Sequence, residues 1–266
     1  MSFIDISTLF AVICYLTATV AILTKLFDSQ GPNQLLVLML ACFAIIPHTL
    51  LTGNQVFSDE QVNFNLPNVV TLVSLIITLL ITSVSLKFKL NLLLPAVYGF
   101  AGIWLIISML LPEVALMPLA VNKAMVISHI TLSLIAYCVL IIACLYSFQV
   151  AYINMKLKSK QLNAVNQLPP LMQVEHQLFL ILGVGTIALA ASQITGFIFL
   201  DTFFSKANAH KTVLSLMALA VYLVIIWGHY KNGWRGHKVM TLTIIATGLL
   251  TLSYFGSRFV KEFLIG

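Results

Sequence analysis

The feature that most constrains this chain is a succession of long apolar segments with almost no charge inside them. A membrane-spanning helix needs roughly 20 mostly apolar residues, and we count about eight segments that meet this requirement. They are residues 3–24, 32–51, 66–86, 90–111, 124–155, 174–200, 210–230 and 239–263. We also expect the end of the fifth segment, residues 154–161, to continue as helix into water. The sequence therefore predicts an all-α, polytopic membrane bundle.

The composition leaves no room for a separate soluble domain. Only 8% of the 266 residues are charged, whereas a soluble domain carries roughly 25%. We therefore expect one transmembrane domain over residues 1–266. The net charge of +6 does not indicate nucleic acid as a partner, because basic loops of membrane proteins commonly face anionic lipid. Membrane lipid is the partner that this charge favours.

The basic residues predict the orientation of the chain. Cytoplasmic loops of membrane proteins carry an excess of Lys and Arg. One side of the predicted bundle collects nine of these residues: Lys25, Lys87, Lys89, Lys156, Lys158, Lys160, Lys231, Arg235 and Lys238. The opposite side has five, together with most of the acidic residues. We therefore expect a multi-pass protein with both termini outside the cytoplasm.

Three histidines, His48, His129 and His229, lie inside or at the ends of these apolar segments. An ionisable group at membrane depth is costly and suggests a functional site. Neutral imidazole is also a common ligand of iron, copper and zinc. The three histidines are therefore candidate metal ligands.

Their depths decide which of them can act together. At 1.5 Å per residue, His48 and His129 belong to the outer half of the bundle, and His229 lies about 20 Å from His129 along the membrane normal. His48 and His129 can then bind one metal ion together. His229 either has no partner or pairs with another histidine, for which His176 and His237 are available.

Each histidine also has a structural interpretation that the residues leave open. His48 follows Pro47 near a predicted helix end, where an interfacial histidine is equally common. His129 shares a helical face with Ser133 and Tyr137, which favours a functional role over interhelical bonding. His229 opens a glycine-rich turn. There, Lys231 and Arg235 are either a clamp for carboxylates or a basic membrane anchor.

The cysteines, the acidic residues and the glycines say less about the function than the histidines do. Cys14, Cys42, Cys138 and Cys144 form no CxxC or CxxCH motif, and are expected to be small buried side chains. No Asp or Glu lies in mid-membrane, which counts against cation-coupled transport. The sixth segment contains many small residues, including Gly183, Gly185 and Gly196, which suits close helix packing.

Several short motifs, in this order and spacing, resemble the CcsA-like family of cytochrome c assembly membrane proteins. They are FNLPNVVTLVS at 64–74, LLPAVY at 93–98, Ser128-His129 with Tyr137, LPPLMQVE at 168–175, GHY at 228–230 with GWRG at 233–236, and YFG at 254–256. The likeness covers nearly the whole chain. It is greatest for the family's bacterial inner-membrane branch called YpjD, which is related to HemX.

The resemblance implies haem handling at a bacterial inner membrane. The outer side, where the Lys/Arg asymmetry places both termini, is then the periplasm. His129 matches the family's outer histidine, His229 matches the histidine before its basic loop, and His48 fits the branch. The haem-ligating synthases also carry a WGxxWxWD-type loop. Here residues 200–210 read LDTFFSKANAH, without tryptophan, and a second outer histidine, expected near Ile265, is absent.

Taken together, the sequence predicts a membrane protein that binds or moves b-type haem in support of cytochrome c-type assembly or haem homeostasis. The expected iron ligands are His48, His129 and His229, with Arg235 binding a haem propionate. No enzymatic activity is expected, and other membrane or cytochrome assembly proteins are candidate partners. Two alternatives remain open. One is a small-molecule permease, and the other is a membrane interaction or regulatory subunit with structural histidines.

Overall fold

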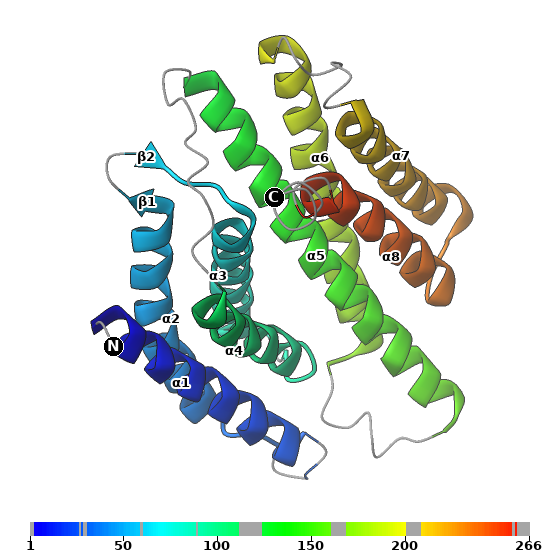
Figure 1. Cartoon of the computed structure of the whole chain (residues 1–266). Helices are drawn as coiled ribbons and strands as arrows, with labels where there is room; N and C mark the ends of the chain where they lie inside the picture. Colours follow the sequence, from blue (N-terminus) through cyan, green and yellow to red (C-terminus); the bar gives the residue numbers. More distant parts are fainter. Residues whose placement is uncertain are drawn as a thin grey trace. The chain divides into compact units, whose positions relative to one another are not determined.

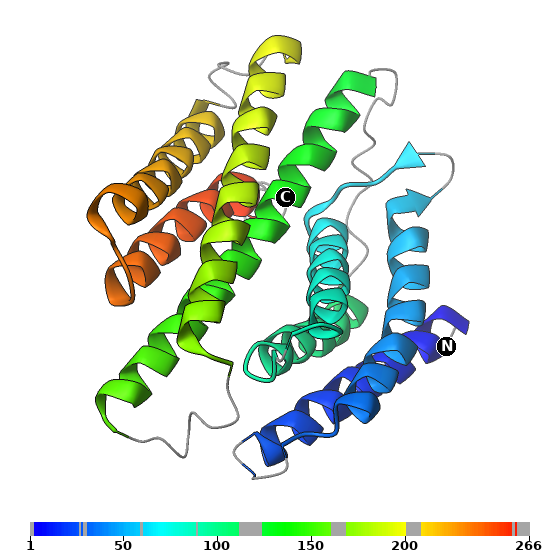
Figure 2. The ribbon, with the colours of Figure 1, turned by 180° about the vertical axis from the view of Figure 1, so that it is seen from behind.

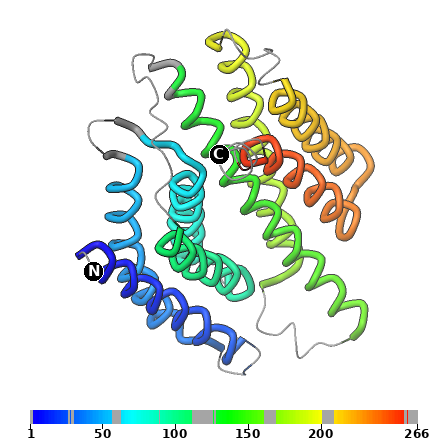
Figure 3. Tube along the Cα trace, viewed as in Figure 1, coloured from blue at the N-terminus to red at the C-terminus, as the bar shows by residue number. Residues whose placement is uncertain are grey.

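The structure is a computed structural model. It describes residues 3–26, 28, 31–58, 61–88, 90–111, 124–160, 169–200, 209–256 and 259, and Figure 3 marks the remainder in grey. The chain forms two compact units. The N-terminal unit comprises Met1–Leu119 with Lys156–Pro169, and the C-terminal unit comprises Ala120–Met155 with Pro170–Gly266. Each unit is described by itself, and the single domain expected over residues 1–266 stays a prediction.

The described part of the N-terminal unit is built mainly of helices, which are labelled in Figure 1. They are α1 (Phe3–Lys25), α2 (Gln34–Val56), α3 (Leu66–Ser85) and α4 (Leu94–Leu110). Helix α1 packs against both α2 and α4, and α3 packs against α2 and α4. Between α2 and α3 lies a short antiparallel pair, β1 (Phe57–Ser58) and β2 (Gln61–Val62), which the sequence analysis did not predict.

The first family motif, at 64–74, builds the start of α3. The Asn65 side chain accepts a hydrogen bond from the Asn68 N–H and caps the helix, and a proline follows in the first turn. The Asn68 side chain donates to the Gln55 carbonyl at 2.8 Å and to the Asn63 carbonyl at 3.3 Å. These bonds attach the end of α2 to the beginning of α3, so the motif has a structural role here.

The C-terminal unit contains α5 (Ala124–Lys158, whose last residues belong to the N-terminal unit), α6 (Leu171–Phe199), α7 (Ala209–Asn232) and α8 (His237–Thr251), which continues into the π-helical turn η2 (Leu252–Gly256) (Figure 2). Helices α7 and α8 pack side by side, and α6 packs against α7. At Gly185 of α6, an added Cβ would lie 2.7 Å from Cδ2 of Leu140 on α5. The glycine thus permits the close helix approach expected from the small residues of this segment.

The predicted fold class is confirmed. Among the described residues, seven helices are long and apolar enough to cross a membrane, and α4 is a shorter apolar helix, so the chain is a multi-pass membrane protein. The extension of α5 into its basic tail is confirmed as far as Lys158. The end predicted for α2 at Leu51 was wrong, because the helix continues to Val56. The eighth segment is an α-helix only to Thr251, and its predicted end lies outside the described residues.

Candidate functional site

His48 lies at the meeting point of three helices in the N-terminal unit. Its side chain is fully buried. Its Nδ1 is 3.2 Å from the Tyr15 hydroxyl of α1, and its Nε2 is 3.4 Å from the Ser74 hydroxyl of α3. Because α2 runs on to Val56, the residue lies roughly 12 Å from the helix end, deeper than the predicted boundary placed it. Both ring nitrogens have hydroxyl partners, so metal ligation would require one partner to withdraw.

The Ser74 contact belongs to a row of buried hydroxyls along α3. Thr71 accepts a hydrogen bond from the Trp104 indole at 3.0 Å, and Thr82 pairs with the Tyr98 hydroxyl at 3.0 Å. The Tyr15 and Tyr98 rings stack with their centroids 5.8 Å apart. Polar side chains that pair across helices hold membrane bundles together. His48 therefore forms part of a hydrogen-bonded framework that joins the four helices of this unit.

His129 lies in the second turn of α5 and is half-buried. Its Nδ1 is 2.9 Å from the Ser192 carbonyl oxygen of α6 and 3.3 Å from the Thr195 hydroxyl. A carbonyl oxygen can only accept, so Nδ1 must carry the hydrogen and donate it. In the neutral ring Nε2 then holds the lone pair, which is the form of histidine that binds a metal.

His229 lies in the last turn of α7 and repeats this arrangement. Its Nδ1 is 3.1 Å from the main-chain carbonyl oxygen of Trp234, so Nδ1 donates here too. The imidazole also stacks on the Phe179 ring of α6, with centroids 3.4 Å apart and planes 15° apart. The ring plane and the tautomer are therefore both fixed by neighbours.

Helix α6 gives the separation of these two histidines, because each of them contacts it. Ser192, beside His129, and Phe179, beside His229, are 13 positions apart, which corresponds to roughly 20 Å of helix. One metal ion cannot contact both rings, as the sequence had indicated. His48 belongs to the other unit, so its pairing with His129 stays a prediction.

The remaining predicted partners of His229 do not approach it as ligands. His176 and His237 are exposed, and the His237 ring pairs with the Thr241 hydroxyl of its own helix at 3.0 Å. The polar stripe that follows His129 has a different role. The Tyr137 hydroxyl pairs with that of Thr251 at 3.0 Å, and the main-chain carbonyl of Ser133 accepts from the Tyr254 hydroxyl at 3.3 Å. These bonds attach α5 to the end of α8 and to η2, whereas the Ser133 hydroxyl donates to the Ile130 carbonyl of its own helix.

Arg235, the predicted propionate ligand, already contacts a carboxylate in this structure. Its Nε lies 3.5 Å from Oε1 of Glu175 at the beginning of α6. The Arg235 side chain is 66% exposed and that of Glu175 is 12% exposed. The guanidinium has further donors for a second carboxylate, so the propionate role of Arg235 stays a prediction.

Two buried polar side chains of α5 were not predicted as candidates from the sequence. Tyr146 and Gln149 are fully buried, and the Tyr146 hydroxyl and both amide atoms of Gln149 have no hydrogen-bond partner among the described residues. Buried polar atoms are nearly always paired, so each of them needs a water, a ligand or a partner. The available signal was a glutamine inside an apolar run.

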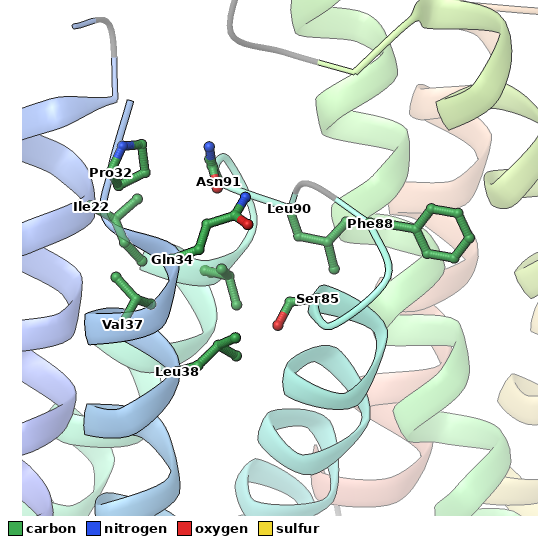
Figure 4. Close-up of a pocket in the computed structure, with 10 residues that line it drawn as sticks. Ile22, Pro32, Gln34, Val37, Leu38, Ser85, Phe88, Leu90 and Asn91 are labelled. Atoms are coloured by element: carbon green, nitrogen blue, oxygen red, sulfur yellow. The ribbon is translucent and has the colours of Figure 1, made fainter. Parts of the chain in front are cut away.

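Clusters of metal-ligating side chains and pockets also bear on where the candidate site lies. Within the described part of the chain, no three His, Cys, Asp or Glu side chains come together as a metal cluster. A pocket of the N-terminal unit, shown in Figure 4, contains Gln34, Ser85 and Asn91 but no histidine among the ten residues that line it. The candidate ligands are therefore the single histidines. In His129 and His229 a main-chain carbonyl oxygen accepts from Nδ1 and leaves Nε2 on the other side of the ring, an arrangement common among metal-ligating histidines.

Several known proteins are similar to this chain in sequence. The chain is 36% identical over 256 residues to inner membrane protein YpjD of Escherichia coli strain K12, an alignment that covers 96% of this chain and 97% of that protein. The YpjD protein of E. coli O157:H7 matches equally. A 28.8 kDa Azospirillum brasilense protein from the nifR3-like 5' region is 33% identical over 141 residues, 52% of each chain. No solved structure matches.

The family model described as cytochrome C assembly protein matches residues 33–265. This range includes all three candidate histidines and all the motifs on which the resemblance was based. The chain belongs to the cytochrome c assembly protein family.

Proposed function

We propose that this protein is a multi-pass inner membrane protein that binds b-type haem, with His129 and His229 as ligands at two separate sites, and so supports cytochrome c assembly or haem homeostasis. Family membership supports the involvement of haem and of cytochrome assembly. The inner-membrane relatives and the apolar helices support the location.

The observation that carries the proposal is a hydrogen-bond pattern that His129 and His229 have in common. Each ring donates from Nδ1 to a main-chain carbonyl, at 2.9 Å and 3.1 Å. Metal-ligating histidines usually have such a partner on the other nitrogen, which fixes the tautomer and raises the basicity of the ligand. His48 has hydroxyls on both nitrogens, which favours a structural role for it.

Bound haem would supply an iron that accepts imidazole nitrogen as a ligand. The protein would contribute Nε2 of His129, beside Ser192 of α6, and Nε2 of His229, beside Phe179 of the same helix. Residues 200–210 lack the tryptophan-rich sequence of the synthases. We therefore propose binding or transfer of haem, without thioether formation by this chain alone.

The test is the visible spectrum and the haem content of protein purified from haem-replete cells. The wild type should show a haem absorption band. His129→Ala and His229→Ala should each lose a separate part of the haem, because the two sites lie roughly 20 Å apart along α6. His237→Ala is the matched control, since that ring is exposed and bonded within its own helix, and it should retain full haem content.

A colourless wild type from haem-replete cells would contradict the proposal. The histidines would then be explained by the small-molecule permease or by the membrane interaction subunit. Retention of all haem in either His129→Ala or His229→Ala would remove that residue from the proposed sites.

We further propose that both termini are periplasmic, from the asymmetry of Lys and Arg. The test is labelling of single cysteines from outside the cell, in a background without the four native cysteines. Cysteines at positions 59 and 206 should react, and cysteines at positions 158 and 235 should not. Labelling from outside at position 158 would overturn the orientation.

A further inference from the structure

We propose that the turn between α7 and α8 is a positioning element for His229, in which Trp234 holds the tautomer of the imidazole and Phe179 holds its plane. The inference deepens the proposed function and rests on it for the role of haem. The positioning itself is a property of the protein alone.

The first step is the path of the main chain. Helix α7 ends at Asn232, and Gly233 and Gly236 then adopt φ values of +62° and +61°, which side chains with a Cβ rarely adopt. The Trp234 N–H donates to the Gly228 carbonyl at 3.1 Å, and its own carbonyl accepts from His229. The peptide groups of Trp234 are thus attached at both ends to the last turn of α7.

The second step is the position of the Trp234 indole. A Cβ added at Gly228 would clash with Cε3 of Trp234, far inside van der Waals contact. The indole therefore lies directly against the main chain of α7 at a position where only glycine leaves room. The Lys238 ammonium lies 3.4 Å from the indole centroid, which adds a cation–π contact. These contacts fix the residue whose carbonyl bonds His229.

The third step concerns the ring of His229. A hydrogen bond from Nδ1 fixes one point of the imidazole but leaves it free to rotate about that bond. Stacking on Phe179, with planes 15° apart, removes this freedom. Together the two contacts determine the direction of the Nε2 lone pair. Phe179 and Trp234 are positioning residues, because they act through His229.

The first variant to test is Gly228→Ala, which should displace the Trp234 indole and with it the carbonyl. NMR of protein with ¹⁵N-labelled histidine reports the tautomer without haem, and comparison with His229→Gln assigns the signal. We expect His229 to carry its hydrogen on Nδ1 in the wild type and to show a mixture of tautomers in Gly228→Ala. Haem affinity at this site should fall on the order of 10- to 100-fold, as for other outer ligand partners.

The matched control is Gly248→Ala. Gly248 is also a helical glycine in the same unit, but nothing lies within 4 Å of a Cβ added there. This variant should keep the wild-type tautomer and haem content. A circular dichroism melt of each variant checks that the bundle is folded, so that a change of tautomer is not confused with unfolding.

Phe179→Leu separates the two contacts. It should keep the Nδ1–H tautomer but broaden the haem absorption and lower haem retention, and Phe179→Tyr should restore both. An unchanged tautomer in folded Gly228→Ala, or a wild-type hydrogen on Nε2, would overturn the positioning role. If the tautomer changes as expected but wild-type protein never binds haem, the positioning stands and the proposed function fails.

Discussion

In the N-terminal unit the buried histidine has hydroxyl partners on both ring nitrogens, whereas in the C-terminal unit His129 and His229 each donate one nitrogen to a main-chain carbonyl. A hydroxyl can donate or accept, so it adapts to either tautomer of the ring. A carbonyl only accepts, so it selects one tautomer and leaves Nε2 with its lone pair. The accepting group, more than burial, separates a histidine suited to structure from one suited to ligation.

The histidines also differ in their burial and in their position along the helices. His48 is fully buried among hydroxyls that join four helices, so its removal should affect the stability of the unit. His129 and His229 are half-buried near helix ends, where loss of a ring leaves the surrounding helices largely intact. The comparison therefore predicts opposite results for stability and for haem.

The largest expected effect on stability is that of His48→Ala. It removes a fully buried ring and leaves the Tyr15 and Ser74 hydroxyls without this partner, which should cost about 3 kcal/mol. Haem per folded protein should stay unchanged. The measurements are thermal unfolding followed by circular dichroism, and haem content of the folded fraction.

The control for this prediction is His129→Ala, which should lose haem with a smaller change in unfolding temperature. If His48→Ala instead lost haem and kept its stability, the pairing of His48 with His129 predicted from the sequence would be supported. The contrast between the two units would then be wrong.

The next effect tests the packing of the C-terminal unit. Gly185→Ala would bring a Cβ within 2.7 Å of Leu140, and overpacking of this kind should cost about 1–3 kcal/mol. Gly183→Ala, two residues away on the same helix, has open space and should be neutral or stabilising, by up to about 1 kcal/mol. Thermal unfolding of the two variants gives the comparison. Equal destabilisation would show that α6 does not approach α5 closely at Gly185.

A smaller effect is expected for the hydroxyl partners of His48. Tyr15→Phe and Ser74→Ala should each cost about 1 kcal/mol, because one buried hydrogen bond is lost in each. In a double-mutant cycle each should couple to His48→Gln by about 0.5–1 kcal/mol. Unfolding in mixed detergent with increasing sodium dodecyl sulfate measures these terms. Zero coupling would mean that the two hydroxyls do not stabilise the protein through their hydrogen bonds to His48.

The smallest effect on stability concerns Arg235 and Glu175. Because the arginine is 66% exposed, breaking the pair should change stability by no more than about 1 kcal/mol. If Arg235 also binds a propionate, Arg235→Ala should lower haem retention and Arg235→Lys should restore it only in part, since a point charge replaces a fork. Glu175→Gln is the matched control, because it frees Arg235 without removing it. Equal haem in all three variants would make the pair a membrane-surface contact only.

Most of the helices could be predicted from hydropathy alone. In lipid every main-chain polar group must be satisfied within the element, so a long apolar segment has little choice but to be a helix. The ends were less certain. The segment Thr52–Val56 carries polar residues typical of a loop, yet it is helical. The Asn68 side chain of α3 donates a hydrogen bond to the Gln55 carbonyl and so stabilises the end of this helix. That bond joins residues 13 positions apart and leaves no local signal.

The sequence by itself determined the class of the protein, its succession of apolar helices, its family and the identity of the unusual membrane histidines, because each of these depends on composition and spacing along the chain. Only the tertiary structure decided which atoms face those histidines. The register of α5 against α6 places the Ser192 carbonyl at His129, and the crossing of α1, α2 and α3 places two hydroxyls at His48. Such contacts join residues 26–63 positions apart, and their geometry comes from side-chain packing between helices, which no periodicity in the sequence records.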